Sequence, residues 1–234
     1  MSEVKIARFV DIEACKSIFS DKSTFVLRSP VHYQRLYETS GGAKGDIKEG
    51  RPDTDSGTSE FMRWVVSCWT LLGRREPTSE EWDIFKEDER NIVAIVSTPS
   101  RVCKFLNRVF MTGEKPLFWQ VEHREVEYDK EKVHVDHTNI TDVVPFAKDK
   151  RFEKEHEYRF VLKYGWGPHL IDSFIFCGGV DYMEPSFANP RMCEQDKKML
   201  LSILSEAMAG YGDFKGKSLG DIISNIEEIL NVKS

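Results

Sequence analysis

The stretch "FMRWVVSCWTLL", residues 61–72, decides the fold of this chain because it is apolar at almost every position. A strand that is covered on both faces has such a continuous run, whereas a strand with one wet face alternates. A second apolar run, "NIVAIVST" at 91–98, leads directly into a segment that begins a helix at Pro99. The two runs predict a sheet whose central strands are buried beneath helices.

Further strands and helices are predicted on both sides of these runs. Strands are expected at 24–30, 116–128, 151–165 and 170–179. Helices are expected at 11–19, 32–38, 77–88, 99–110, 193–210 and 219–231. Strands dominate the middle of the chain, so the fold class is predicted to be α+β, with a mixed or mostly antiparallel central sheet flanked by helices. The helical part from residue 190 onward is expected to pack as a pair on one side of the sheet.

The length of 234 residues fits a single domain that covers residues 1–234. Residues 39–60, "TSGGAKGDIKEGRPDTDSGTSE", are rich in Gly, Asp, Ser and Thr and nearly free of large apolar side chains. Such a stretch cannot bury enough surface to offset the entropy of ordering it, so a long mobile loop is expected there. This loop is either a lid over a site or a dispensable insertion.

Composition excludes several classes of protein. The formal net charge is −6, so there is no general attraction to phosphate backbones and a nucleic-acid partner is not expected. No apolar run approaches the roughly 20 residues that span a bilayer, so no membrane association is expected. The five cysteines are scattered and form no Cys-x-x-Cys pair, which predicts reduced thiols in a cytoplasmic protein and no metal site.

The segment "RFEKEHEYRFVLKYG", residues 151–165, combines a charged front with an apolar end. If it is one strand, Glu155, Glu157 and Arg159 share one face, and His156 lies on the apolar face that enters the core. Two carboxylates at this spacing repel each other unless solvent, a cation or a ligand relieves them. The charged face is therefore either a solvated strand edge, neutralised by Arg159 or a cross-strand lysine, or part of a binding site.

Several short motifs together resemble an uncharacterised bacterial family known as domain of unknown function 2971. They are "VVSCWT" with a Trp-containing helix after it, "NIVAIVSTPSRV", "KDKRFEKEHEYRFVL" and "IDSFIFCGG". The resemblance runs from Thr24 to Gly179 and implies a bacterial protein without a known activity. One motif departs from the family, since "HYQRLYE" stands where the family has a segment like "FNDPFD".

A second resemblance concerns chemistry. The order Arg28, Ser67, then Glu155-x-Glu157 is similar to the Arg…Ser…Glu-x-Glu arrangement of ADP-ribosyltransferases. It implies that Arg28 binds a phosphate of NAD and that Ser67 supports the nicotinamide ribose. Glu157 would bond the ribose hydroxyl and stabilise the oxocarbenium-like charge, and Glu155 would orient or deprotonate an acceptor.

The sequence departs from the ADP-ribosyltransferase pattern at the central strand, and it contains a second Glu-x-Glu motif. The central strand reads Ser-Cys-Trp in place of Ser-Thr-Ser, and a second Glu-x-Glu occurs at Glu125 and Glu127. Trp69, the tryptophan of that strand, is either a core anchor or one wall of a pocket in which a base stacks. Arg159 is the remaining candidate for ligand binding, beside the two glutamates.

Two hypotheses for function follow. The first is an ADP-ribosyltransferase-like enzyme that acts on a nucleotide or another phosphate-bearing small molecule, with NAD as the substrate to test. It requires one cleft that gathers Arg28, Ser67, Glu155, Glu157 and Arg159. The second is a non-catalytic accessory or sensor module of a bacterial stress or phage-defence system, with a protein partner and a charged strand that has a structural role.

Overall fold

The computed structural model describes residues 3–19, 24–41, 64–85, 92–110, 118–128, 144–164, 173–177, 184–189 and 191–211. The chain divides into two units that are interleaved along the sequence. Unit 1 contains Met1–Phe25, Leu72–Val102 and Phe176–Ser234, and unit 2 contains Val26–Leu71 and Cys103–Ile175. The loop predicted at 39–60 lies outside the described residues except for 39–41, and so does the helix predicted at 219–231.

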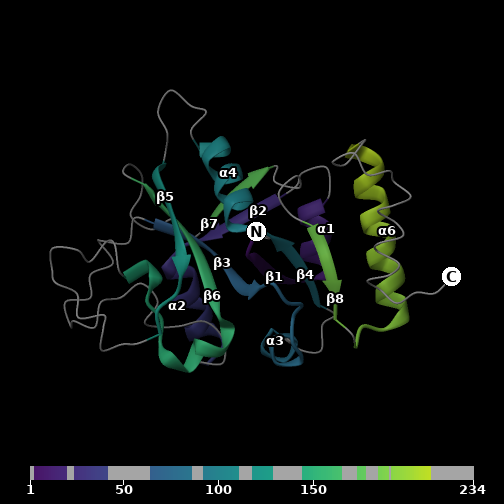
Figure 1. The fold of residues 1–234 in the computed structure, drawn as a ribbon, viewed down its shortest axis with the longest axis horizontal. Coiled ribbons are helices and arrows are strands. Elements are labelled where there is room, and N and C mark those ends of the chain that lie inside the picture. The colour runs from purple at the N-terminus through teal and green to yellow at the C-terminus, as the bar shows by residue number, and fades with distance from the viewer. Residues whose placement is uncertain are drawn as a thin grey trace. The chain divides into compact units, whose positions relative to one another are not determined.

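Helices and strands alternate irregularly along the chain (Figure 1). In chain order the described elements are β1 (Lys5–Asp11), α1 (Ile12–Phe19), β2 (Thr24–Arg28), α2 (Pro30–Thr39), β3 (Trp64–Gly73), α3 (Ser79–Ile84), β4 (Ile92–Ser97), α4 (Pro99–Phe110), β5 (Phe118–Glu125), the 3-10 helices η3 (Val144–Phe146) and η4 (Lys150–Glu155), β6 (Glu157–Tyr164), β7 (Ser173–Cys177), β8 (Glu184–Ala188) and α6 (Glu194–Tyr211). Every strand pair with a defined register is antiparallel. The predicted α+β class with a mostly antiparallel sheet is confirmed.

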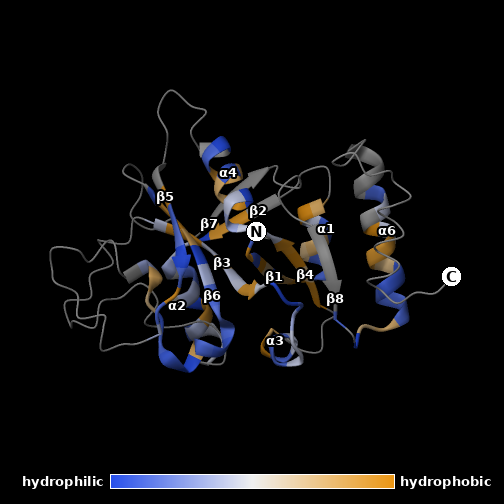
Figure 2. Cartoon of the chain, in the orientation of Figure 1, coloured by the Kyte–Doolittle hydropathy of each residue, from blue (hydrophilic) through white to orange (hydrophobic). Residues whose placement is uncertain are grey.

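Unit 1 is built on β4, which pairs with β1 on one side and with β8 on the other. All six residues of β4 are buried, as its unbroken apolar sequence predicts, and the strand is hydrophobic along its length in Figure 2. Trp82 of α3 packs edge-on against Phe9 of β1, with 5.0 Å between the ring centroids. The apolar residues of this core are Ala7, Leu72, Trp82, Ile92, Ala94 and Val96.

Two strands of unit 1 were not predicted. The apolar residues of β1 come in adjacent pairs, so the strand shows neither alternation nor a continuous run. β8 contains Pro185, which normally argues against a strand because proline lacks a backbone N–H. Its pairing with β4 shifts register between Ala94 and Ile95, and Pro185 stands opposite Ile95 at this irregularity. Prolines within sheets are found at such bulges.

The N-terminus of α3 is held by a reciprocal cap. The Thr78 hydroxyl accepts a hydrogen bond from the backbone N–H of Glu81, and the Glu81 carboxylate accepts one from the backbone N–H of Thr78 at 2.8 Å. Arg75 donates to both oxygens of Glu81, at 2.6 and 2.5 Å. The helix is only six residues long, so its N-terminal cap fixes the direction in which Trp82 enters the core of unit 1.

Replacing Thr78 with Ala is expected to lower the free energy of unfolding by about 0.5–2 kcal/mol, because an N-cap oxygen is lost. Thr78→Ser, which keeps that oxygen, is the matched control and should stay near the wild-type value. Urea denaturation followed by circular dichroism measures both variants. Equal stability of the two variants would contradict a role for the hydroxyl.

Unit 2 is built on β3, which pairs with β6 and with β2, while β5 pairs with the other edge of β6. One face of β3 and β6 carries an apolar cluster of Trp64, Val66, Phe146 and Val161. Tyr33 of α2 packs against this cluster, so α2 and η3 cover the same face of the sheet. The apolar run at 61–72 is therefore explained by burial on β3, from Trp64 onward.

The helix predicted at 193–210 is present as α6, which packs against α1 within unit 1. Its buried residues include Leu200 and Ile203. In the described part of the chain, none of the helices combines the length and the apolar character that crossing a bilayer requires.

Candidate functional site

The charged segment before β6 is not one strand, which corrects the face assignment made from its sequence. Lys150–Glu155 forms the 3-10 helix η4, capped by Asp149, whose side chain accepts a hydrogen bond from the N–H of Arg151. His156 then turns the chain in the left-handed conformation, with φ 44° and ψ 50°. The strand begins only at Glu157, and His156 is exposed instead of buried in the core.

Glu157 and Arg159 form a buried ion pair along β6. Arg159 donates from Nε to Oε1 of Glu157 at 2.6 Å and from Nη2 to Oε2 at 3.1 Å. The third nitrogen of the guanidinium, Nη1, donates to the backbone oxygen of Pro145 at 2.8 Å. The two side chains are 4% and 1% exposed, so the pair is removed from water. Such planar, two-bond contacts are the strongest geometry for an arginine and a carboxylate.

Lys148 joins the second carboxylate to this pair. Its Nζ lies 3.0 Å from Oε2 of Glu157 and 2.6 Å from Oε2 of Glu155. Glu155 therefore reaches Glu157 from η4 and not from the strand. Of the alternatives that the sequence left open, cations relieve the repulsion between the two carboxylates: Arg159 pairs with Glu157, and the lysine comes from the loop before η4 and not from a neighbouring strand. We call Lys148, Glu155, Glu157 and Arg159 the charge cluster.

The charge cluster separates the protonation behaviour of the two glutamates. Burial alone would raise the pKa of Glu157, but the positive charges of Arg159 and Lys148 outweigh it and hold this pKa well below its usual range. For Glu155 burial prevails and raises the pKa, and the negative charge of Glu157 adds to the rise. Glu155 is also more accessible, with 22% of its side chain exposed.

Three neutral groups complete the surroundings of Glu157. The Tyr128 hydroxyl accepts a hydrogen bond from the backbone N–H of Glu157 at 2.7 Å. The Cys68 thiol bonds the Glu157 side chain, and the Tyr33 hydroxyl lies 3.4 Å from the sulfur of Cys68. Burial, and then the negative charge of Glu157, raises the pKa of the Cys68 thiol, which therefore stays protonated near neutral pH.

Arg28 lies on the same face of the sheet as the charge cluster but at a distance from it. Arg28 stands directly opposite Val66, and Glu157 opposite Thr70, and residues opposite each other share a face. Val66 and Thr70 are four residues apart on β3, which corresponds to about 14 Å along a strand. Arg28 is half-buried and has no ion pair with a carboxylate in the described ranges.

Ser67 and Trp69 lie on the opposite face of β3 from Glu157. Ser67 stands opposite Phe160, and its hydroxyl accepts a hydrogen bond from the indole N–H of Trp69 at 2.9 Å. Trp69 is 2% exposed and packs edge-on against Phe160. Of the residues predicted to share one cleft, the structure brings together Glu155, Glu157 and Arg159. It does not bring Ser67 to them, because adjacent strand residues point to opposite faces, and it does not bring Arg28 to them, because Arg28 lies further along the sheet. Trp69, the other candidate for ligand binding, lies on the same face as Ser67.

Two residues that contact Glu157, Lys148 and Tyr128, are not predicted from the sequence. Lys148 comes seven residues before Glu155, a separation that signals contact in neither a helix nor a strand. Tyr128 lies 29 residues before Glu157, and no local pattern connects them. A cation was expected somewhere near the glutamates, so charge balance was the one signal that pointed toward Lys148.

No described group of three or more His, Cys, Asp or Glu side chains is arranged to hold a metal ion. Four of the five cysteines have described side chains, and each is a free thiol: Cys15, Cys68, Cys103 and Cys193.

Comparisons of this chain with protein-family models, with curated proteins and with solved structures find no match. They do not test the resemblance to domain of unknown function 2971 or to ADP-ribosyltransferases, and both stay predictions.

Proposed function

We propose that this protein is a non-catalytic accessory or sensor module, in which the Glu-x-Glu segment stabilises unit 2 instead of transferring a group. The observation that carries the proposal is that both carboxylate oxygens of Glu157 are already engaged. Each accepts a hydrogen bond from Arg159, and Oε2 accepts a further one from Lys148. Transfer from NAD would need an oxygen of this carboxylate within hydrogen-bond reach of a ribose hydroxyl.

The positions of the other predicted site residues favour the same proposal. Ser67 is 1% exposed and its hydroxyl is already bonded to Trp69, so a ribose would have to displace a buried indole to reach it. Arg28 is about 14 Å along the sheet from the glutamates, with Val66 and Cys68 between them on the same face.

ADP-ribosyl transfer is retained as a second candidate because of Glu155. This carboxylate lies beside Glu157 on a shared Lys148, keeps 22% exposure, and has a raised pKa. A raised pKa near a second, ionised carboxylate is typical of a residue that exchanges protons with a substrate. In this candidate Glu155 is the group that meets the acceptor.

Incubation with NAD distinguishes the two candidates. The non-catalytic proposal expects no release of nicotinamide and no change in the melting temperature at millimolar NAD. A ligand at 100 times its dissociation constant would instead add about 2.7 kcal/mol to the stability of the folded state. Nicotinamide release by the wild type that is lost in Glu155→Gln, with an unchanged circular dichroism spectrum, would overturn the proposal and establish the second candidate.

Arg28→Ala is the matched variant for NAD binding, because Arg28 lies outside the charge cluster and its removal leaves the Glu157–Arg159 pair intact. A thermal shift with NAD that Arg28→Ala abolishes would assign Arg28 to phosphate binding and count against the proposal. Equal melting curves for both proteins, with and without NAD, support it.

A further inference from the structure

The outer edge of β5 carries backbone hydrogen-bonding groups that have no partner among the residues that the structure describes. β5 is the last strand in the order of its sheet and pairs with β6 on one edge (Figure 1). The N–H of Val126 donates to the oxygen of Glu157, so even-numbered residues of this strand direct their backbone groups toward β6. The odd-numbered residues Val121, His123 and Glu125 therefore direct theirs outward. In the part of the chain that the structure describes, no hydrogen bond satisfies these outward groups.

Two residues beyond Glu125, the same edge already binds another segment of the chain. The N–H of Glu127 donates to the oxygen of Phe146 at 2.8 Å, and the oxygen of Glu127 accepts from the N–H of Lys148 at 3.0 Å. This parallel bridge shows that the edge has strand geometry and accepts a further segment. The bridge ends at Glu127, so the edge from Val121 to Glu125 is the stretch that remains open among the described residues.

The side chains along this stretch complement themselves. Glu122 and Arg124 flank His123, with a negative charge on one side and a positive charge on the other. If two copies of the strand pair antiparallel about an axis at His123, Glu122 of each copy stands opposite Arg124 of the other. Opposite charges at directly opposed positions stabilise an antiparallel pair. The outward hydrogen-bonding residues also match, because Val121 then faces Glu125 and His123 faces His123.

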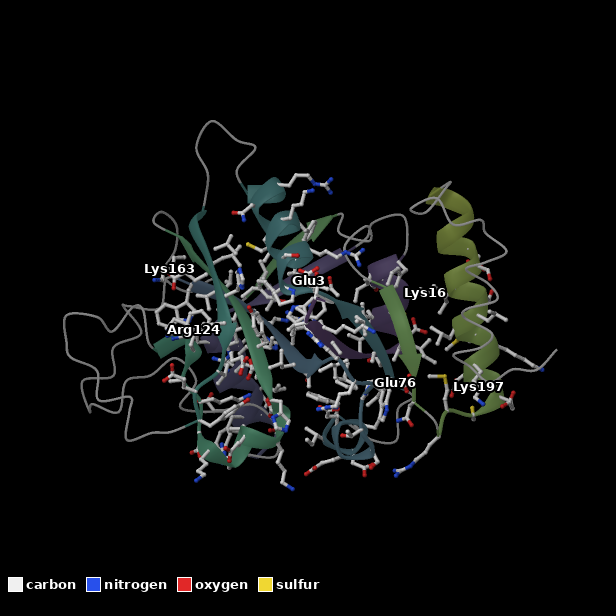
Figure 3. All side chains as sticks on the ribbon, in the orientation of Figure 1. Glu3, Lys16, Glu76, Arg124, Lys163 and Lys197 are labelled. Carbon is white, nitrogen blue, oxygen red and sulfur yellow. The ribbon has the colours of Figure 1, made fainter. Side chains whose placement is uncertain are left out.

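We propose that this protein associates with a second copy of itself through the outer edge of β5, with the two strands antiparallel and centred on His123. The occupant is a second copy because the order of charges complements its own reversal. His123, Arg124 and Glu125 are exposed and Glu122 is half-buried, and the guanidinium of Arg124, which Figure 3 labels, lies 4.5 Å from the centroid of the Phe146 ring. Glu122 is held at the strand by Lys163 of β6 at 2.9 Å. This inference does not depend on the proposed function.

Replacing His123 with Pro tests the backbone part of the interface. Proline at 123 removes an outward N–H and leaves the hydrogen bonds between β5 and β6, which use even-numbered residues. His123→Ala is the matched control: both variants lose the 2.7 Å contact with the Tyr158 hydroxyl, but Ala keeps the N–H. Sedimentation velocity over a hundredfold concentration range should show dimer for the wild type and for His123→Ala, and monomer for a folded His123→Pro. A wild type that stays monomeric throughout, or equal association of the two folded variants, would overturn the proposal.

Charge exchange tests the register. Arg124→Glu and Glu122→Arg each place like charges opposite each other in the dimer, so each should shift the equilibrium toward monomer. The double variant Glu122→Arg with Arg124→Glu restores opposite charges, so it should associate more strongly than either single variant. Circular dichroism confirms that all three are folded. Single and double variants that associate equally would show that the copies do not pair about His123.

Discussion

Replacing Glu157 with Gln is expected to lower the free energy of unfolding by about 3–5 kcal/mol. Glutamine has nearly the volume of glutamate, so packing is kept and the negative charge alone is removed. The Arg159 guanidinium then remains 1% exposed without the carboxylate that it binds through two nitrogens. Urea denaturation followed by tryptophan fluorescence measures the loss.

Glu155→Gln is the matched control for this prediction. Glu155 is 22% exposed, and Lys148 keeps its contact with Glu157 when Glu155 is neutral. The pKa of Glu155 is raised in the folded protein, so folding does not stabilise its negative charge, and neutralising it should change the free energy of unfolding by less than about 1 kcal/mol. Equal losses for Glu155→Gln and Glu157→Gln would contradict a specific role for the buried pair.

Acid removes the contribution of Glu157 in a defined direction. The pKa of Glu157 in the folded protein lies below that of a glutamate in an unfolded chain, which is about 4.3. The stabilisation is therefore complete above that pH and is lost as the pH falls toward the folded pKa. The difference between wild type and Glu157→Gln should shrink steadily below pH 4, and a difference independent of pH would contradict this account.

Replacing both members of the buried pair distinguishes the cost of leaving one charge unpaired from the cost of changing the packing. Glu157→Leu leaves a buried guanidinium, and Arg159→Met leaves a buried carboxylate with Lys148 beside it. The combination of both changes removes the two charges together, and buried pairs replaced in this way are often neutral. The free energy of unfolding should therefore fall less in the double variant than the sum of the decreases in the two single variants. The backbone oxygen of Pro145 loses its donor in the double variant, which keeps part of the cost.

Replacing Trp69 with Ala is expected to cost about 3–5 kcal/mol, because a fully packed indole leaves a cavity. Trp69 is 2% exposed, lies edge-on to Phe160 with 6.5 Å between ring centroids, and donates to Ser67. The prediction separates the two interpretations of this tryptophan, because a residue that lines an open binding pocket is less costly to truncate. Chemical denaturation again provides the measurement.

Trp69→Phe and Ser67→Ala are the controls for Trp69. Phenylalanine keeps a ring against Phe160 but leaves the Ser67 hydroxyl without its indole donor, so an intermediate loss is expected. Adding Ser67→Ala to Trp69→Phe removes that hydroxyl and should recover part of the loss. A loss below about 1 kcal/mol for Trp69→Ala would contradict the placement of the indole in the core.

The sequence predicted those elements whose apolar pattern is strong. β3 and β4 are near-continuous apolar runs, and both are central strands with buried residues. β1 and β8 escaped prediction for different reasons: β1 has no clear period, and β8 includes Pro185 at an irregular position of the ladder. Burial by neighbouring strands, which no local pattern contains, is what makes these two segments strands.

The candidate site was predicted less completely than the fold. Glu155, Glu157 and Arg159 do come together, but the period of two failed at His156, where a left-handed residue separates η4 from β6. A positive φ at a histidine is uncommon and cannot be read from residue type. The contact between Lys148 and both glutamates follows from this turn, and so it was also beyond the reach of sequence periodicity.

Because the two units are interleaved along the sequence, their residues are completed at different times during translation. A growing chain contains every residue of unit 2 once Ile175 has been added, whereas unit 1 still lacks β8 and α6. β1, which comes first in chain order among the described strands, thus belongs to the unit whose residues are completed later. Until Glu184–Ala188 is synthesised, the hydrophobic strand β4 lacks the strand that pairs with this edge, and unpaired hydrophobic edges of this kind favour aggregation.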